Sequence, residues 1–314
     1  MTLAAVVIGR NEGARLEACL ASLATETATI IYVDSGSTDG SVSVAKAAGA
    51  DVISLPMDKP FTAARARNAG AAMLPAEVEM IQFLDGDCTL RAGWIVSARR
   101  FLADNPQVAV VCGRRRERAP EASVYNGLVD REWDTAIGET KACGGDALIR
   151  ADAFRQAGGY RENLIAGEEP ELCLRLRQLG WKIWRLDAEM TWHDAQITRF
   201  SQWWRRSRRA GHAFAEGAAL HGAAPEHHWV RETQRAILWG GILPVSLMVA
   251  AIVISPWALI VLLIYPLQAV RLATKMGWTW GIFTVLGKFP EALGVIEYHL
   301  RRLRGGNFRI IEYK

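Results

Sequence analysis

The sequence predicts an α/β protein with a mostly parallel sheet, followed by a C-terminal region of membrane-associated helices. Short apolar runs alternate with helical patterns up to about residue 115, and the segment 237–270 carries no charged residue. Strands that alternate with helices of this length are typical of βαβ units and a parallel sheet. A chain of 314 residues, half of them hydrophobic, has room for a large core and a second region.

The first part of the chain supplies the elements of the sheet. We expect strands at 3–8, 30–33, 52–55, 80–84 and 108–112, and helices at 12–24, 40–48, 62–74 and 94–104. The segment from 116 to 200 is mixed. The run "GGDALIRADAFRQAGGY" predicts a strand, a short helix and a glycine turn, "GEEPELCLRLRQLG" predicts a helix, and 181–186 predicts a strand.

The uncharged run is too long for one straight membrane span. As a single helix it would measure roughly 50 Å, against a hydrocarbon core of about 30 Å. Ser255 and Pro256 divide it near the middle, which predicts a helical hairpin over 236–273. Arg235 and Arg271 would then mark the cytoplasmic side. A re-entrant hairpin and a buried helical core remain the alternatives.

The net charge and the cysteines argue against a nucleic-acid-binding protein and against a disulfide-bonded or zinc-binding one. The net charge of +4 is too small to indicate nucleic-acid binding, and the basic residues gather instead at 199–209 and 301–309, on both sides of the uncharged run. The five cysteines are scattered without a C-x-x-C pair, which favours free thiols in a reducing cytosol over disulfides or a zinc site.

Polar motifs follow three of the predicted strands. "GRNEG" comes after the first strand, "DSGSTDG" after the second and "DGD" after the fourth. In open parallel sheets, ligands bind beyond the carboxyl ends of the strands. We therefore expect these three acidic loops to meet at one crevice.

The motif Asp85-Gly86-Asp87 directly follows a predicted buried strand. Two carboxylates separated by one residue offer hard oxygen ligands for Mg²⁺ or Mn²⁺. Gly86 leaves space for a phosphate to approach the backbone. The alternative is an ordinary acidic turn, because Asp and Gly are common turn residues.

Other candidate residues each have a functional and a structural interpretation. Asp34 could accept a hydrogen bond from a base or ribose. Arg67 could bind a phosphate or belong to a solvated helix face. Glu168 and Glu169 could include a general base or merely stabilise a helix N-terminus. His193 could be a third metal ligand or a structural histidine.

The segment "QWWRR" combines Gln202 and Arg205 with two tryptophans. An amphipathic helix at the membrane interface explains this composition, and so does a cap over an anionic donor.

In order and spacing, these motifs together resemble the family 2 glycosyltransferases, whose catalytic domain has the GT-A fold. The resemblance covers residues 3–209. It implies that Asn11 and Glu12 line the nucleotide pocket, and that Asp34, the first acidic residue of the "VDSGSTDG" motif, reads the base.

The resemblance assigns further donor and metal sites. The family's R-N-x-G motif falls on Arg67 and Asn68, and its D-x-D motif falls on Asp85 and Asp87. This implies that Asp87 is the direct metal ligand, with Asp85 beside it and His193 as a further ligand. The cofactor implied is Mn²⁺ or Mg²⁺ on the diphosphate of the donor.

The catalytic pair of the family falls on Glu168 and Glu169, which makes Glu169 the implied general base, and Q-x-x-R-W falls on Gln202, Arg205 and position 206. There are three departures from the family pattern. The first strand leads into "IGRNE" instead of "PxYNE", Glu169 replaces the usual aspartate, and Arg206 replaces tryptophan. The last departure favours transfer of a single sugar over processive polymerisation.

The expected function is inverting transfer from a nucleoside-diphosphate sugar, a UDP-sugar in particular, to a membrane-presented hydroxyl. Acceptors of this kind are lipid-linked glycans, glycolipids and exopolysaccharides. The catalytic domain would span 1–200, with a donor half to about 115 and an acceptor half at 116–200. It would face the cytoplasm from the inner membrane. Interfacial helices (201–235), the hairpin and a basic C-terminal region (274–314) would follow.

Two other functions share parts of this pattern. A sugar nucleotidyltransferase would have a glycine-rich basic loop after the first strand, where "GRNEG" has few glycines. A catalytically inactive membrane-anchored protein could bind a sugar nucleotide or act as a scaffold. A Rossmann dehydrogenase is excluded by the absence of G-x-G-x-x-G in that loop.

Overall fold

The computed structural model describes residues 2–304. These form two compact units. Of the described residues, the N-terminal unit contains 2–122, 129–164 and 168–196, and the C-terminal unit contains 123–128, 165–167 and 197–304. The short segment 165–167 therefore belongs to the C-terminal unit although it lies between two segments of the N-terminal one.

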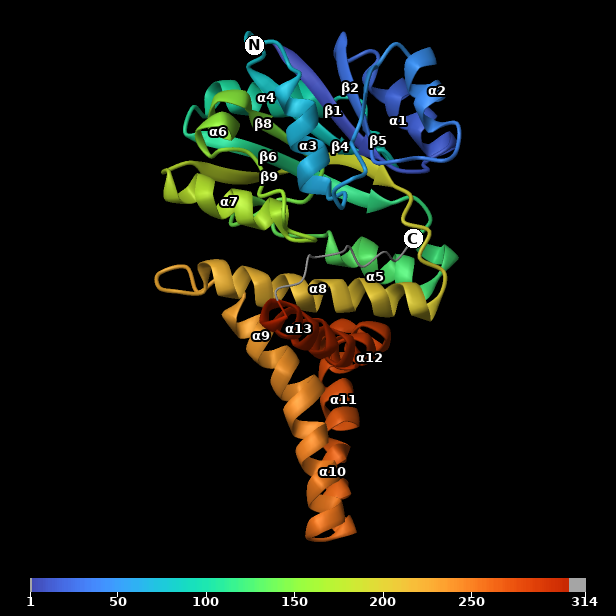
Figure 1. Ribbon diagram of the computed structural model, residues 1–314, viewed down its shortest axis with the longest axis vertical. Coiled ribbons are helices and arrows are strands. Elements are labelled where there is room, and N and C mark those ends of the chain that lie inside the picture. The colour runs from blue at the N-terminus through green and yellow to red at the C-terminus, as the bar shows by residue number, and fades with distance from the viewer. Residues whose placement is uncertain (1, 305–314) are drawn as a thin grey trace. The chain divides into compact units, whose positions relative to one another are not determined.

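A nine-stranded sheet forms the centre of the N-terminal unit (Figure 1). Its order is β3-β2-β1-β4-β8-β6-β9-β5, with β7 pairing to β9. The strands are β1 (Leu3–Gly9), β2 (Thr29–Asp34), β3 (Asp51–Ser54), β4 (Met80–Asp85), β5 (Cys88–Leu90), β6 (Val108–Glu117), β7 (Gly138–Thr140), β8 (Ala147–Arg150) and β9 (Lys182–His193).

The first four strands of the sheet order are parallel, as the βαβ pattern predicts. Strand β6 is also parallel to β9, whereas β8 is antiparallel to both β4 and β6, and β5 and β7 are antiparallel to β9. The sheet is therefore more mixed than the sequence pattern indicates. The antiparallel strands β5 and β7 have three residues each, too few to show a periodicity in the sequence.

Helices cover both faces of this sheet. On one face α3 (Ala63–Ala72), α6 (Ala151–Gln156) and α7 (Glu168–Gln178) contribute to one apolar cluster. On the other, α1 (Ala14–Leu23), α2 (Ser41–Ala47) and α4 (Trp94–Asp104) contribute to a second. Successive side chains of β1 point to opposite faces of the sheet. Val6 therefore belongs to the first apolar cluster and Val7 to the second.

Close packing of α3 against β1 requires a glycine. A Cβ atom built on Gly70 would lie 2.4 Å from Cγ1 of Val6 and 3.0 Å from Cγ2 of Val33. Real Cβ atoms essentially never show a contact of 2.4 Å, and one of 3.0 Å is tight, so glycine allows α3 to approach this closely. This approach brings the side chains of α3 to the carboxyl end of the sheet.

The C-terminal unit is helical. It contains α8 (Phe200–His221), α9 (Val230–Ile237), α10 (Leu243–Val253), α11 (Ile264–Met276), α12 (Trp278–Leu286) and α13 (Lys288–Leu303). Helix α5 (Val124–Glu132) begins in this unit and ends in the other. Helices α8 and α13 pack closely, since a Cβ on Gly294 would lie 2.0 Å from the carbonyl oxygen of Arg208.

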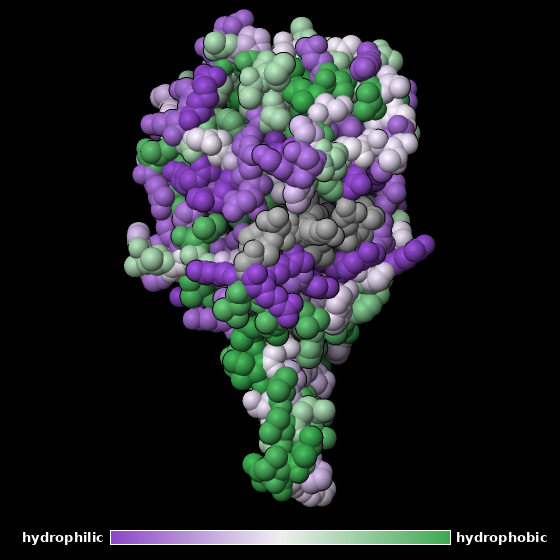
Figure 2. All heavy atoms as spheres, viewed as in Figure 1, coloured by the Kyte–Doolittle hydropathy of each residue, from purple (hydrophilic) through white to green (hydrophobic). Residues whose placement is uncertain are grey.

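Two helical segments are long and apolar enough to cross a membrane, Val230–Val253 and Pro256–Met276. They meet at the break predicted at Ser255 and Pro256. In the most apolar stretch of 18 residues in each segment, only 6% is buried within the protein. Hydrophobic side chains accordingly cover much of this hairpin (Figure 2). Ile252 and Trp257 are 82% and 77% exposed. Such exposure disfavours a buried core helix. Residues 305–314, including Arg309 of the predicted basic tail, lie outside the described residues.

Candidate active site at the strand ends

Asp34 ends β2 and is 3% exposed. Its Oδ2 accepts hydrogen bonds from the N–H groups of Gly36 and Ser37, both at 3.0 Å, and its Oδ1 accepts one from the Tyr32 hydroxyl at 3.3 Å. The carboxylate therefore fixes the tight turn of the "DSGSTDG" loop, in which Gly36 has a φ of 81°.

Asn11 links this loop to the loop after β1. It adopts a left-handed conformation, with a φ of 57°, and its Oδ1 accepts the N–H of Thr38 at 2.7 Å. Its own N–H donates to the Ser37 hydroxyl at 2.9 Å. Neighbouring Glu12 forms an ion pair with Arg15 at 2.8 Å. A Cβ on Gly86 would lie 3.1 Å from Cγ of Glu12, so the D-x-D loop also meets this position.

Arg67 lies at the centre of the site. It is 2% exposed, which rules out a solvated helix face. Its Nη2 is 2.8 Å from Oδ1 of Asp85, and its Nη1 is 3.0 Å from Oε1 of both Glu168 and Glu169. One guanidinium thus joins the first aspartate of D-x-D to the acidic start of α7, which lies about 80 residues further along the chain.

Asn68 has a different environment. Its Nδ2 donates to the carbonyl of Tyr160 at 2.8 Å, and its Oδ1 accepts the Tyr160 N–H at the same distance. The amide thereby holds the turn that includes Gly159 and Tyr160 against α3. It stabilises the wall of the site on which the Tyr160 ring lies 5.5 Å from the Arg67 guanidinium carbon.

Three residues of this site were missed by the sequence analysis. Arg115, on β6, is 3.3 Å from Oδ2 of Asp85 and 3.5 Å from Oδ2 of Asp146. The fully buried Asp146 carboxylate also accepts the Asp85 N–H at 3.1 Å. Gly145 lets this loop come close, because a Cβ there would lie 2.3 Å from Nη2 of Arg67. The sequence analysis interpreted the "GGDA" run only as the beginning of a predicted strand.

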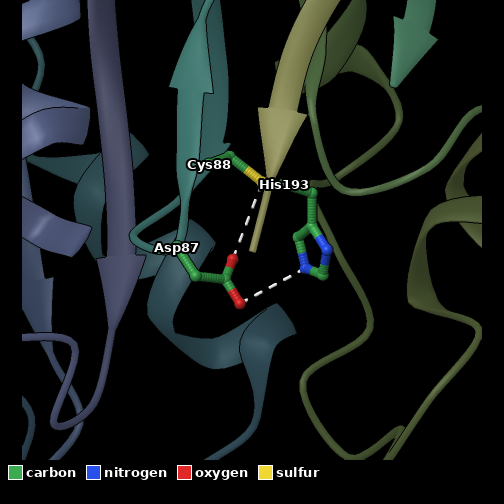
Figure 3. A group of neighbouring side chains, drawn as sticks. All are labelled: Asp87, Cys88 and His193. Carbon is green, nitrogen blue, oxygen red and sulfur yellow. Dashed lines mark hydrogen bonds and ion pairs between the residues drawn. The ribbon is translucent and has the colours of Figure 1, made fainter. Parts of the chain in front are cut away.

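The second aspartate of D-x-D faces a separate group (Figure 3). Oδ2 of Asp87 is 3.3 Å from Nε2 of His193, at the end of β9, and its Oδ1 accepts from the Cys88 thiol at 3.6 Å. On the far side of the ring, Nδ1 of His193 is 3.2 Å from Oε2 of Glu117. Glu117 was also missed, because nothing local in "RRRERAP" distinguishes it.

The electrostatics favour a neutral imidazole at His193. Burial, followed by the nearby Arg115, lowers the pKa of His193 below its usual value. A neutral ring that donates its Nδ1–H to Glu117 presents the Nε2 lone pair toward Asp87. This carboxylate–histidine arrangement is typical of metal ligands with an orienting carboxylate behind them.

The residues present suit a divalent cation. Ligand atoms of Asp87, Cys88 and His193 lie within 4.8 Å of one another, and so do those of Asp85, Cys88 and Asp146. Burial raises the pKa of Cys88 well above its usual value, so the shared thiol stays protonated and is a poor ligand. A carboxylate oxygen and an imidazole nitrogen remain at Asp87 and His193, a combination that Mn²⁺ accepts well.

Glu168 and Glu169 differ in accessibility. Their side chains are 4% and 16% exposed, so Glu169 is the one a bound molecule could reach. Burial first, and then the charge of Glu168, raise the pKa of Glu169 to about 7, although Arg67 acts in the opposite direction. A carboxylate with this pKa can both accept and release a proton near neutral pH.

Gln202 and Arg205 belong to the C-terminal unit. Oε1 of Gln202 accepts the N–H groups of Thr198 and Arg199, both at 3.0 Å, and so caps α8. Arg205 is exposed, and its Nε donates to the carbonyl of Ser201 at 3.3 Å. The role of this pair toward a donor stays a prediction.

A mixed sheet of this topology, with a D-x-D motif directly after a parallel strand, defines the GT-A class of glycosyltransferase domains. Residues 5–155 match the family described as glycosyl transferase family 2, and the N-terminal domain belongs to that family. The class and family expected from the sequence are thus confirmed.

Two curated relatives match about half of the chain. The pre-mycofactocin glycosyltransferase of Mycobacterium tuberculosis strain H37Rv is 30% identical over 171 residues, which is 50% of this chain and 35% of that protein. The succinoglycan biosynthesis protein ExoA of Rhizobium meliloti is 29% identical over 192 residues, 56% of this chain and 58% of that protein. The chain therefore spans between about a third and somewhat over half the length of these relatives.

Solved structures resemble the fold over a larger share of the chain. The mannosyltransferase PcManGT from Pyrobaculum calidifontis, solved with GDP-Man and Mn²⁺, has a TM-score of 0.66 at 19% identity, covering 94% of this chain and 86% of that one. Glucosyl-3-phosphoglycerate synthase from Mycobacterium tuberculosis, with Mg²⁺ and UDP, has a TM-score of 0.50 at 17% identity, covering 70% and 79%. At these identities the likeness concerns the fold alone.

Proposed function

We propose that the protein is an inverting glycosyltransferase that moves a sugar from a nucleoside-diphosphate sugar to a hydroxyl group. The observation that carries this proposal is the contact of Arg67 with both Asp85 and Glu169. It joins a D-x-D loop of the kind that binds a sugar nucleotide to a carboxylate with a pKa suited to proton transfer. A family 2 domain over residues 5–155 supports it.

The donor would bind over the carboxyl ends of β1, β2 and β4. Asn11, Glu12 and Asp34 shape the loops there, which supports a role in holding the nucleoside. Arg67 and Asp85 would lie toward the diphosphate, with Asn68 keeping the wall beside them in place. We propose a UDP-sugar as the donor, and a test against GDP-sugars decides this point.

Asp87 and His193 would hold Mn²⁺ or Mg²⁺, with Asp85 next to them. When bound, such an ion neutralises charge on the departing diphosphate. Glu117 would orient the His193 ring through the Nδ1 contact of 3.2 Å. Arg205 would add positive charge toward the same diphosphate.

In the chemical step Glu169 would remove the proton of the acceptor hydroxyl. The oxygen forms a new bond to the anomeric carbon from the face opposite the diphosphate, and the bond between that carbon and the diphosphate oxygen breaks. The products are an inverted glycoside, a nucleoside diphosphate and a protonated Glu169. Arg67 holds the ionised form of Glu169 in place before the step and opposes the rise of its pKa.

We further propose that the acceptor is presented at the inner membrane, with the catalytic domain on the cytoplasmic side. The exposed apolar hairpin of Val230–Val253 and Pro256–Met276 supports attachment to a bilayer. Arginines at 235 and 271 near the same end of the hairpin support the orientation. A lipid-linked glycan, a glycolipid or a growing exopolysaccharide fits such a location, and one relative is a succinoglycan biosynthesis protein.

The experiment compares the wild type with Glu169→Gln in detergent, using UDP- and GDP-sugars with Mn²⁺. Thermal stabilisation by the correct donor should be equal in both proteins, whereas transfer to a lipid-linked acceptor should collapse in the variant. The anomeric configuration of the product, read by NMR, must be opposite to that of the donor. Retention, or equal transfer by both proteins, would remove Glu169 from the proposed role.

The same assay separates the two alternatives. A catalytically inactive binder would be stabilised by a donor but would transfer no sugar to any acceptor. A sugar nucleotidyltransferase would release pyrophosphate from a nucleoside triphosphate and a sugar phosphate. Either result would contradict the proposed function.

A further inference from the structure

Trp229 occupies a slot between two glycines of the C-terminal unit. A Cβ built on Gly167 would lie 2.5 Å from Cη2 of the indole, and a Cβ built on Gly217 would lie 2.4 Å from its Cε3. Any other residue at either position would therefore collide with the ring. The benzene part of the indole therefore lies close to the backbone of Gly167 and to that of Gly217 in α8.

Both the ring and the backbone of Trp229 are held. The indole stacks on His228 with a centroid distance of 4.3 Å and meets the edge of Phe214 at 5.4 Å. The carbonyl oxygen of Trp229 accepts from the N–H and the hydroxyl of Thr233, at 3.0 and 2.8 Å. Trp229 itself has a φ of 53°, which is uncommon for a residue that is not glycine and indicates a position fixed by its surroundings.

Gly167 directly precedes the acidic start of α7. Its φ of 83° belongs to the left-handed region, and Glu168 is the first residue of the helix. Gly167 is therefore bonded directly to Glu168 and is two residues before Glu169. On the other side, Trp229 is the residue before α9, with which the first apolar segment begins.

We propose that Trp229 is a positioning residue for the catalytic base: its indole holds Gly167 in the conformation from which α7 starts. This inference rests on the proposed function of Glu169. A displacement of about 1 Å in a reacting group costs on the order of 100-fold in rate, so loss of the indole should act on kcat.

The first test replaces the ring. In Trp229→Leu, kcat should fall about 10- to 100-fold while the KM for the donor changes less than threefold, and Trp229→Phe should recover part of the loss. The acid limb of the pH–rate profile should shift, because the contact of Glu169 with Arg67 is disturbed. Trp278→Leu is the control, since Trp278 is 64% exposed and lies in α12. An unchanged kcat and an unchanged acid limb in Trp229→Leu would overturn the proposal.

The second test uses the fit between the ring and the helix. Gly217→Ala would normally favour a helix, but its Cβ would push the indole and should lower kcat in the wild-type background. In Trp229→Leu the same substitution should cost much less, because the contact of 2.4 Å with the indole is gone and only the contact of 3.0 Å with His228 remains. Additive losses in the double variant would contradict the coupling.

A third measurement does not depend on activity. Amide hydrogen exchange at 165–170 should be faster in Trp229→Leu than in the wild type, with β1 and β4 unchanged. If exchange at 165–170 is unchanged, Trp229 does not hold the loop and the inference fails. If exchange rises but the wild type transfers no sugar, the proposed function fails and the contact with the loop stands.

Discussion

Nη1 of Arg67 lies 3.0 Å from Oε1 of Glu169, and both side chains are largely withdrawn from solvent. The other end of the same guanidinium binds Asp85 at 2.8 Å. Buried charges are stable only when they are paired and hydrogen-bonded, so each partner of Arg67 depends on the others. The donor side and the base side of the site are therefore one electrostatic unit.

Arg67→Ala should destabilise the protein by about 3–5 kcal/mol, because it leaves buried carboxylates without a counter-charge. The measurement is the free energy of unfolding in urea. Arg65→Ala is the matched control on α3, since Arg65 donates at 2.7–3.4 Å to the exposed backbone carbonyls of Pro56, Lys59 and Pro60. A loss for Arg67→Ala no larger than that of the control would show that Arg67 does not organise the site.

The pH dependence of the rate should follow Glu169. Because its pKa is raised to about 7, kcat/KM should rise about tenfold per pH unit below 7 and level off above it. The measurement is initial rate between pH 5 and 9 with saturating Mn²⁺. Glu169→Asp should retain an acid limb at reduced rate, and a wild-type rate that is flat across this range would contradict the assignment.

Stability should depend on the same group with the opposite trend. An acid whose folded pKa is raised contributes stability that is full below its unfolded value of 4.5 and is lost as the pH rises through about 7. The loss is on the order of 3 kcal/mol. Urea unfolding at pH 5.5 and 8 should therefore show a smaller decrease for Glu169→Gln than for the wild type. Equal decreases would mean that Glu169 titrates normally.

Glu117→Gln should weaken Mn²⁺ binding about 10- to 100-fold without removing a ligand, because it releases the His193 ring from its orienting contact. Calorimetric titration of Mn²⁺ in the presence of UDP measures this directly. Glu189→Gln provides a control near the same pair of strands, where Glu189 pairs with Arg116 at the surface. Unaltered affinity in Glu117→Gln would separate His193 from metal binding.

Gly145→Ala should abolish most activity, because its Cβ would lie 2.3 Å from Nη2 of Arg67 and 3.1 Å from Glu169. Gly144→Ala is an adjacent control, since no described residue other than its two chain neighbours lies within 4 Å of a Cβ at that position. Rates and melting temperatures of the two variants make the comparison. Similar rates for both would show that the loop can retreat from Arg67 at little cost.

The sequence alone was enough to identify the acidic residues at the ends of the parallel strands. Asp34 and Asp85 each come directly after an apolar run of strand length, Asp87 follows two residues after Asp85, and βαβ order places such positions at one edge of a sheet. The uncharged run and its break at Ser255 were equally evident, since hydropathy and proline act locally. Helix α4 was predicted with its observed bounds for the same reason.

Only the tertiary structure decided which of these residues meet. The helix pattern alone allows Arg67 to be a surface arginine. In the structure α3 and α7 pack on the same face of the sheet, which brings Glu169 to 3.0 Å from Arg67. Asp146 and Glu117 carry no local signal, because their roles arise from β8 and β6 pairing with distant strands. Periodicity reports which face of an element is buried, whereas the partners across that face depend on long-range packing.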